Sequence, residues 1–219
     1  MRNYIDSIIE DFVSRCEKDY TDHYKYIQRL IEMSEVDLSR ITEQQVKWEV
    51  RPFLYEWGRM GRVLGQSRYK NWESKIAELI QSDCKRLKDF RRKDLSAIGQ
   101  DLNNAQSDIE ECYESFRNIV GPIAASKTLH LICPDFFPLW DNDIARSARS
   151  EIERKDGRGQ KIQELSGAEY YRFMQYILDF LKQHEQVISK LAAKYKRGKL
   201  RIVDETLWRA VHRPLSLFS

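Results

Sequence analysis

Apolar residues recur along this chain at the three- and four-residue spacing of one helix face, and this pattern constrains the fold more than any other feature. It runs from Ile5 to Ile31 and appears again over residues 72–90, 102–116 and 170–188. Nine Gly and five Pro in 219 residues leave few places where a long element must break. Alternating patterns long enough for a β-strand are missing. We therefore expect an all-α fold, built by helix-on-helix packing into a single domain over residues 1–219.

Capping and proline signals predict where several of these helices begin. Pro52 predicts a helix start near Arg51, because proline suits the first helical turn. The pairs Ser107–Glu110 and Ser166–Glu169 each match a capping box, so each predicts a further helix start. The stretch 147–165 is charged and contains glycines, which predicts a mobile insertion.

Composition excludes several classes of protein. Hydrophobic residues make up 42% of the chain and charged residues 32%, which is typical of globular proteins and not of disordered ones. No apolar run reaches the roughly 18 residues needed to cross a membrane, so we expect no membrane partner. Acidic residues near the N-terminus argue against a signal peptide, and a cytoplasmic location is expected.

The cysteine, histidine and charge patterns add weaker expectations. The four histidines are scattered and the four cysteines form no C-x-x-C pair, so we expect no metal and no cofactor. Buried free thiols are expected at Cys16, Cys84, Cys112 and Cys133. Basic runs at 85–93 and 190–201 fit either a polyanion-binding surface or ordinary solvated helix faces.

The segment from Arg117 to Arg146 is the most informative for function. A helix is expected to end near Arg117, followed by a tight turn at Val120-Gly121 and a new helix that begins at Pro122. Free amides at the start of that helix are suited to binding a phosphate group. Further along, Asp141 precedes another helix-like stretch and is a candidate N-cap residue.

This segment resembles the helix-hairpin-helix DNA glycosylase superfamily. IVGPIAA, from Ile119 to Ala125, is similar to the second half of the family's hairpin, and FPLWDNDIA is similar to the loop that carries the family's aspartate. The chain has Ile119 in place of the first hairpin glycine and Arg117-Asn118 in place of the usual Leu-Pro pair. The resemblance implies a helix-hairpin-helix over about 107–132, a catalytic loop over about 133–146, and two helical lobes with a cleft between them.

The resemblance also implies partners and roles. DNA would be held at the hairpin by Val120, Gly121, Ile123, Ala124 and Lys127, and a flipped nucleotide would enter a pocket formed by Tyr55, Trp57, Arg59 and Trp140. Asp141 would stabilise positive charge on the sugar and orient water as the N-glycosidic bond breaks. Ile123 stands where bifunctional members carry a lysine, which implies base excision without strand cleavage. Lys127, one helical turn further on, is a candidate displaced nucleophile.

Simpler interpretations of the same residues stay open. Asp141 can be only a helix cap, Lys127 a solvent or phosphate contact, and His130 a hydrogen-bonded core histidine. Trp140 and the aromatic-rich stretch that contains Tyr55 can belong to the core. For the whole chain, the alternatives to a glycosylase of DNA repair or antiviral defence are a non-catalytic helix-hairpin-helix DNA-binding protein and a small helical protein-interaction factor. An unusual substrate, such as a hypermodified phage-type base, fits the divergence from the family pattern.

Overall fold

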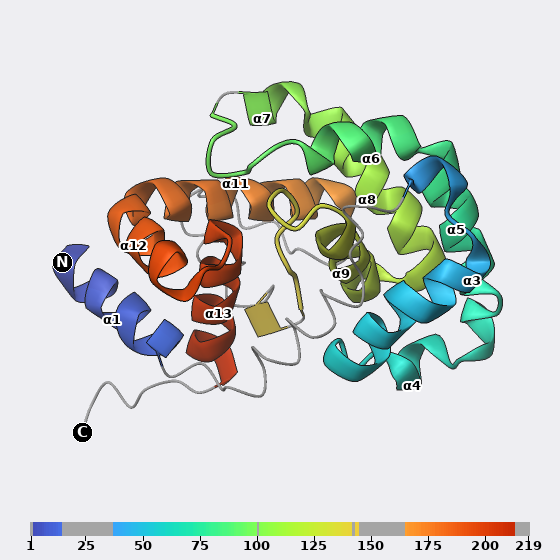
Figure 1. Ribbon diagram of the computed structural model, residues 1–219, viewed down its shortest axis with the longest axis horizontal. Coiled ribbons are helices and arrows are strands. Elements are labelled where there is room, and N and C mark those ends of the chain that lie inside the picture. The colour runs from blue at the N-terminus through green and yellow to red at the C-terminus, as the bar shows by residue number, and fades with distance from the viewer. Residues whose placement is uncertain (1, 15–36, 100, 142, 145–164, 213–219) are drawn as a thin grey trace.

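The computed structural model confirms the all-α fold. It describes residues 2–14, 37–99, 101–141, 143–144 and 165–212, and all regular elements in these ranges are helices (Figure 1). None of the helices in the described ranges is long and apolar enough to span a bilayer. The insertion expected over 147–165 lies outside the described residues except for Leu165, and so does the second half of the helix expected from Ile5 to Ile31.

The longer helices of the described chain are α1 (Arg2–Ser14), α5 (Trp72–Ser82), α6 (Cys84–Arg91), α8 (Gln106–Val120), α9 (Pro122–Ile132), α11 (Gly167–Gln183), α12 (Glu185–Tyr195) and α13 (Lys199–His212). The short α-helices are α3 (Glu43–Gln45), α4 (Gly61–Leu64) and α7 (Asp101–Asn104). Two 3-10 helices, η1 (Leu38–Arg40) and η4 (Ser67–Tyr69), and two π-helices, η2 (Val46–Val50) and η3 (Phe53–Trp57), complete the series.

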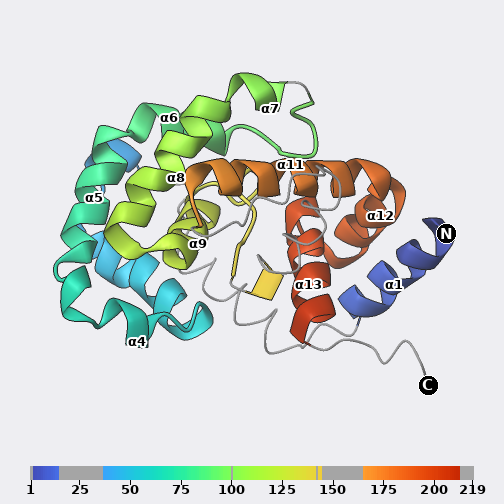
Figure 2. The same cartoon turned by 180° about the vertical axis from the view of Figure 1, so that it is seen from behind.

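These helices contact one another in two groups. In one group α1, α12 and α13 pack together, and in the other α5 packs on α8, η1 and η2 while α9 packs on α8. Helix α11 lies across both groups, against α8 at one end and against α12 and α13 at the other (Figures 1 and 2). The segment that follows α9 runs between the two groups in both views, and it carries the predicted site residue Asp141.

Stacked aromatic rings form the centre of the core and join four elements. Phe90 of α6 stacks on Phe136 with ring centroids 4.8 Å apart, and Tyr113 of α8 stacks on Tyr170 of α11 at 4.3 Å. Phe137 packs edge-on against Phe90 at 5.1 Å. All five side chains are at most 2% exposed, so the segment after α9 is fixed by burial of large apolar surface.

The start of α11 is defined by the predicted capping box. The Ser166 hydroxyl accepts a hydrogen bond from the Glu169 amide, and the Glu169 carboxylate accepts one from the Ser166 amide at 2.9 Å. Gly167 then packs so closely on α8 that an added Cβ would lie 2.6 Å from the Glu110 carbonyl oxygen. The Ser166–Glu169 prediction is confirmed, and the adjacent glycine allows two backbones to approach.

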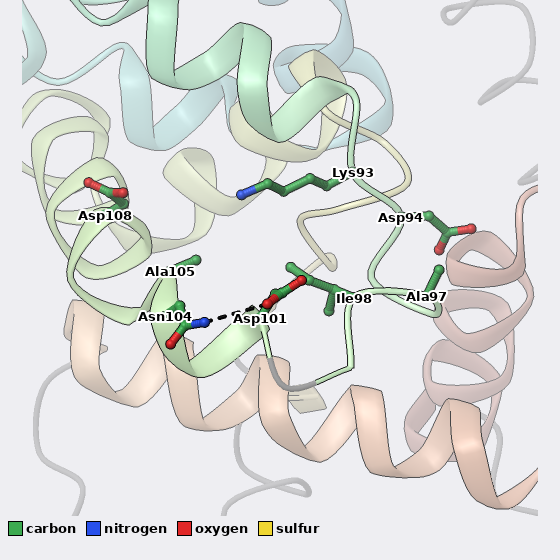
Figure 3. Close-up of a pocket in the computed structure, with 8 residues that line it drawn as sticks. All are labelled: Lys93, Asp94, Ala97, Ile98, Asp101, Asn104, Ala105 and Asp108. Atoms are coloured by element: carbon green, nitrogen blue, oxygen red, sulfur yellow. Dashed lines mark hydrogen bonds between the residues drawn. The ribbon is translucent and has the colours of Figure 1, made fainter.

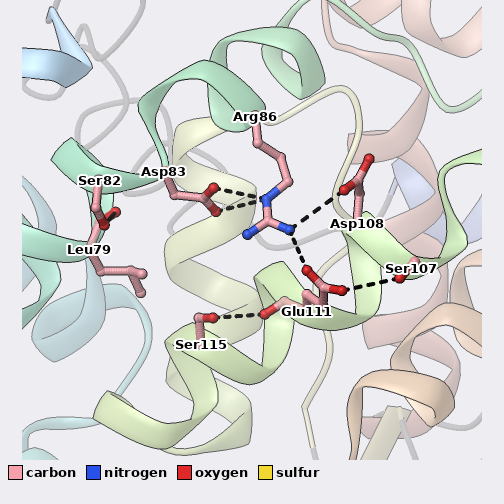
Figure 4. A network of polar contacts seen from close by, with 8 residues as sticks. All are labelled: Leu79, Ser82, Asp83, Arg86, Ser107, Asp108, Glu111 and Ser115. Carbon is pink, nitrogen blue, oxygen red and sulfur yellow. Dashed lines mark hydrogen bonds and ion pairs between the residues drawn. The ribbon is translucent and has the colours of Figure 1, made fainter.

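The prediction of one continuous helix over residues 72–90 is wrong, because α5 and α6 are separated at Asp83. Figure 4 shows the interactions that stabilise this break. The Asp83 carboxylate accepts a hydrogen bond from Arg86 Nε at 2.9 Å, and Arg86 Nη1 reaches Glu111 of α8 at 3.1 Å. A tertiary contact thus ends the helix where no Gly or Pro does. The pattern expected over residues 170–188 is likewise divided at His184.

The helix start predicted at Ser107 is correct to within one residue but lacks the predicted capping box, and the start predicted near Arg51 is wrong. Ser107 is the second residue of α8, and its hydroxyl donates to the Glu111 side chain at 3.2 Å instead of capping the helix. Pro52 lies inside helical backbone that begins after Thr42, whose side chain forms a capping box with Gln45. Proline is tolerated there because η2 and η3 flank it, and their wide π turns already interrupt the regular hydrogen-bond ladder.

Candidate functional site

A single residue, Gly121, forms the turn between α8 and α9. Its φ of +80° and ψ of 167° belong to a region that residues with a Cβ rarely adopt. Pro122 is the first residue of α9, as predicted. Helix α8 continues to Val120 instead of ending near Arg117, because the Gly121 amide still donates to the Arg117 carbonyl at 2.8 Å. An added Cβ at Gly121 would lie only 2.8 Å from the hydroxyl oxygen of Tyr69.

The residues predicted to contact DNA differ in exposure. The buried ones are Val120, Gly121 and Ala124, and the half-buried ones are Ile123 and Lys127. A phosphate at this turn would therefore be bound by backbone amides of α9, because the buried side chains cannot reach it. Tyr69 places a hydroxyl group beside the turn, and Arg68 is exposed next to it in η4.

Asp141 has the geometry of a helix N-cap. Its Oδ1 atom accepts hydrogen bonds from the amides of Asp143 at 2.9 Å and Ile144 at 2.8 Å. The interpretation of Asp141 as a cap is therefore correct, and it is compatible with a catalytic role. Within the described part of the chain, Oδ2 makes no hydrogen bond, and the side chain is partly exposed.

Hydrogen bonds to buried side chains fix the segment that leads to Asp141. The Ser126 hydroxyl of α9 donates to the Trp140 carbonyl at 3.0 Å, and Tyr170 of α11 donates to the Pro138 carbonyl at 2.7 Å. His130 Nδ1 lies 2.8 Å from the Phe137 carbonyl oxygen and must donate to it, because a carbonyl only accepts. Burial lowers the pKa of His130 to about 3, so this histidine is neutral and belongs to the core, as the simpler interpretation held.

Trp140 lies in the core and not on the wall of an open pocket. It is 4% exposed, and its ring packs edge-on against Phe173 at 4.8 Å and beside Tyr170 at 5.6 Å. Its indole Nε1 is buried and has no hydrogen-bond partner among the residues that the structure describes. The predicted stacking of a flipped base on Trp140 would first require this side chain to move.

Lys127 is the predicted residue with the most unusual surroundings. Its ammonium group donates to the Gly58 carbonyl at 3.0 Å. Burial lowers the pKa of Lys127, whereas the negative charges of Asp141 and Asp204 raise it and the positive charge of Arg59 lowers it further. We call these four charged residues the Lys127 cluster. Its members come from α9, the segment after α9, α13 and the turn after η3.

The turn that provides Gly58 and Arg59 has an irregular backbone. Gly58 ends η3 with a π-type hydrogen bond to the Phe53 carbonyl at 2.8 Å, and an added Cβ would lie 2.6 Å from the Leu54 carbonyl oxygen. Arg59 has a φ of +53°, which is uncommon for a residue other than glycine. Such backbone conformations occur most often at functional sites, where surrounding contacts maintain them.

The other predicted pocket residues lie in or near the same turn. Tyr55 of η3 is half-buried, and the Arg51 guanidinium lies over its ring, 4.8 Å from the centroid. Arg59 is exposed. The side chain of Trp57 lies outside the described part of the structure, so its predicted role stays a prediction.

Helix α13 places a buried ionic network beside the Lys127 cluster. Arg201 and Asp204 are 6% and 5% exposed and form an ion pair, and Arg201 Nε lies 3.2 Å from Glu205 Oε1. Glu205 is fully buried and also pairs with Arg197. The interpretation of the basic run 190–201 as a solvated face is therefore wrong for Arg201, which pairs with acids one turn away, and for Arg197, which pairs with Glu205 eight positions further along.

No protein family, curated protein or solved structure matches this chain. Its function must therefore be inferred from the geometry of its own residues. Of the predicted residues, Asp141 and Arg59 influence the pKa of Lys127, and Trp140 lies in the core. Asp204, which the sequence analysis missed, also influences that pKa.

A pocket of about 420 Å³ lies elsewhere, between the segment after α6 and the start of α8 (Figure 3). Asp94, Asp101 and Asp108 line it together with Lys93, and no predicted site residue does. Its excess of carboxylates would repel DNA phosphates. In the described ranges no three or more His, Cys, Asp or Glu side chains are grouped to hold a metal ion.

The sequence contains a partial signal for the buried ionic residues of α13, which the sequence analysis missed. Arg201 lies three positions before Asp204 and four before Glu205, which are the spacings of ion pairs along a helix. The influence of Asp204 on the pKa of Lys127 comes from a helix far along the chain, and no local pattern encodes it.

Proposed function

We propose that this protein hydrolyses the N-glycosidic bond of a damaged or modified base in DNA, with Asp141 as the catalytic carboxylate. One observation carries the proposal: the Ser126 hydroxyl of α9 holds the segment that carries Asp141 against the second helix of the α8–α9 hairpin, where the charge of Asp141 raises the pKa of Lys127. The resemblance to the helix-hairpin-helix DNA glycosylases implies a carboxylate in the loop that follows the hairpin. The electrostatic influence of that carboxylate on the half-buried Lys127 is independent support, because perturbed charged groups concentrate at functional sites.

The chemistry needs a fixed negative charge near the sugar. As the bond between C1′ and the base nitrogen breaks, the base leaves with the bonding electrons and positive charge develops on the sugar. Asp141 Oδ2 would face that charge, and a water molecule adds its oxygen to C1′ while its proton passes to the carboxylate or to solvent. The products are a free base and an abasic site.

The surroundings of Asp141 suit this role, because the carboxylate need not reorganise. Oδ1 is held by two amides, and the preceding residues are fixed to α9 and α11 through Ser126 and Tyr170. Preorganised charge of this kind is the largest single contribution in many enzymes. Tyr55 and Arg59 keep exposed surface near the cluster and are our candidates for contact with the base.

The test is base release by Asp141→Asn. Asparagine is as good an N-cap as aspartate but carries no charge, so the substitution removes the charge and keeps the cap. Wild-type protein should generate alkali-labile abasic sites in duplex or single-stranded DNA that carries damaged bases, alkylated bases or phage-type modified cytosines. Asp141→Asn should reduce base release by about 100-fold or more. Asp143→Asn, a matched change two residues away, should keep most of the activity.

The cap geometry of Asp141 specifically favours a second candidate function, a non-catalytic DNA-binding protein. In that case Asp141 only caps a helix and the α9 amides only bind phosphates. Tight, salt-sensitive DNA binding without abasic sites on any substrate of the panel would establish this second function and refute the first. Absence of DNA binding as well would reject both and leave a helical protein-interaction factor.

A further inference from the structure

Trp48 of η2 is held at the surface of the molecule by a well-packed helix. It is 70% exposed, and no other large hydrophobic residue in the described ranges is exposed. Val46 and Val50 of the same helix are fully buried, so the backbone that carries the indole is anchored to the core. One exposed apolar residue needs no explanation by itself, so the surroundings of Trp48 decide what it can do.

Two arginine–tyrosine stacks accompany this indole. Arg51 comes three positions after it and lies over the Tyr55 ring, 4.8 Å from the centroid. Arg51 Nη1 also contacts the Glu73 carboxylate, in the first turn of α5, at 3.4 Å. Arg68 lies over the Tyr69 ring at 4.7 Å, in η4, which directly precedes α5 in the chain. The contact with Glu73 thus brings the first stack to the end of the segment that carries the second.

The charges around these rings are almost all positive. Residues 51–70 contain five bases and one acid, whereas the whole chain is nearly balanced, with 37 Lys and Arg against 34 Asp and Glu. All six of these charged residues are exposed. The segment from α3 to α4 lies along one edge of the molecule in both views (Figures 1 and 2). We use the name Trp48 surface for the three rings Trp48, Tyr55 and Tyr69 with the five bases Arg51, Arg59, Arg62, Arg68 and Lys70.

We propose that the Trp48 surface binds single-stranded DNA, with bases stacked on its rings and phosphates held by its arginines. A single strand exposes the faces of its bases, which stack on aromatic side chains, whereas a duplex hides them. The Tyr69 hydroxyl borders the turn at Gly121, so the surface is continuous with the start of α9. The choice of DNA over RNA rests on the proposed function, whereas the preference for a single strand does not.

Other partners fit this surface less well. The centre of a protein–protein interface is depleted in charged residues, and here bases alternate with the rings. A helix that lies on a membrane inserts a broad apolar face, and Trp48 is the single exposed large hydrophobic residue that the described ranges contain. Aromatic rings among exposed bases match a polyanion whose own flat groups can stack.

The first experiment measures binding of fluorescein-labelled oligothymidine of about 20 nucleotides by fluorescence anisotropy. Wild type should bind it more tightly than a duplex of the same length. Trp48→Ala should weaken binding about tenfold or more, and Trp48→Phe should keep most of it. Tyr195→Ala is the matched control, because Arg197 lies 5.1 Å from its ring centroid in a similar stack at the end of α12. Its binding should equal that of wild type.

The second experiment tests the bases through the salt dependence of the same binding. Each phosphate contact in a single strand contributes about 0.7 to the slope of log affinity against log salt concentration. Arg68→Gln combined with Lys70→Gln should therefore reduce this slope by about 1.4. Lys85→Gln combined with Arg92→Gln removes two exposed bases from α6 and its C-cap and should leave the slope unchanged.

Several outcomes would overturn the proposal. Equal affinity for single strand and duplex, or unchanged binding by Trp48→Ala, would refute a stacking surface. Binding of oligouridine without binding of oligothymidine would refute the choice of DNA. Binding of phosphatidylserine vesicles that Trp48→Ala abolishes, with neither strand bound, would assign the surface to a membrane. Thermal unfolding should be the same for wild type and Trp48→Ala, because the replaced ring is exposed.

The same binding assay separates this proposal from the proposed function. Asp141 lies outside the Trp48 surface, so Asp141→Asn should bind oligothymidine like wild type. Oligothymidine carries no damaged base, so its binding does not depend on base release. Binding without base release from any substrate would reject only the proposed function. Base release from duplex DNA without binding of oligothymidine would reject only the role of the Trp48 surface.

Discussion

Replacing Gly121 by alanine tests how tightly the hairpin turn is specified. Its φ of +80° with ψ of 167° is essentially restricted to glycine, and forcing a residue with a Cβ into it costs about 1–3 kcal/mol. The new Cβ would also lie 2.8 Å from the Tyr69 hydroxyl oxygen, so Tyr69 must shift, which adds about 1 kcal/mol. We therefore expect Gly121→Ala to lower the free energy of unfolding by about 2–4 kcal/mol.

A double-mutant cycle with Tyr69→Phe separates the two contributions. Phenylalanine lacks the hydroxyl group that the new Cβ meets, so it should recover about 1 kcal/mol in the Gly121→Ala background and leave the backbone contribution in place. Urea denaturation of the wild type, both single variants and the double variant supplies the four free energies. A loss below about 0.5 kcal/mol for Gly121→Ala, or a double variant no more stable than Gly121→Ala, would refute the reasoning.

Two further predictions concern Asp141 and His130. Asp141→Ala should lower the free energy of unfolding by about 1 kcal/mol while Asp141→Asn stays near wild type, and equal losses in urea denaturation would contradict the cap. The pKa of His130 is about 3 in the folded protein against 6.5 for the free side chain, so the unfolded chain binds the proton more readily between those values. The contribution of neutral His130 to the free energy of unfolding should therefore be fully present above pH 6.5. It should fall as the pH drops toward 3, by up to about 1.4 kcal/mol per pH unit. His130→Asn, which keeps a donor for the Phe137 carbonyl, should flatten this dependence in urea denaturation at several pH values. An unchanged slope would show that another group is responsible.

Helical spacing was sufficient to predict the fold class but not the ends of individual helices. The Ser166–Glu169 capping box was found because a local hydrogen-bond pair defines it, and that pair is visible in the sequence. The break at Asp83 was missed because Arg86 and its partners on α8 stabilise it, and the helical pattern continues through it. The helix start predicted from Pro52 was wrong for a related reason, since the π turns around this proline depend on how the whole segment packs on α5.

The residues of the candidate site that lie close together in the sequence could be predicted. Those that come from distant segments could not. Gly121, Pro122 and Asp141 lie within one short stretch, and their roles in the turn and the cap follow from residue type. Asp204 is more than sixty positions further along, so the sequence does not indicate that its charge influences the pKa of Lys127. The Gly58 carbonyl, which anchors Lys127, is set by an irregular backbone that no propensity scale describes.

The cap at Asp141 and the proposed catalysis make different demands on the same side chain. A cap needs only an oxygen that accepts hydrogen bonds, and aspartate, asparagine and serine all provide one. Catalysis by charge needs a carboxylate whose second oxygen is directed at the substrate, and only aspartate of these three provides it. The observation that Oδ1 caps therefore does not exclude catalysis, because the cap uses only one of the two carboxylate oxygens. Stability and base release must be measured on the same Asp141 variants. If Asp141 is only a cap, Asp141→Asn should behave like the wild type in both measurements, whereas the proposed function predicts that it keeps stability and loses base release.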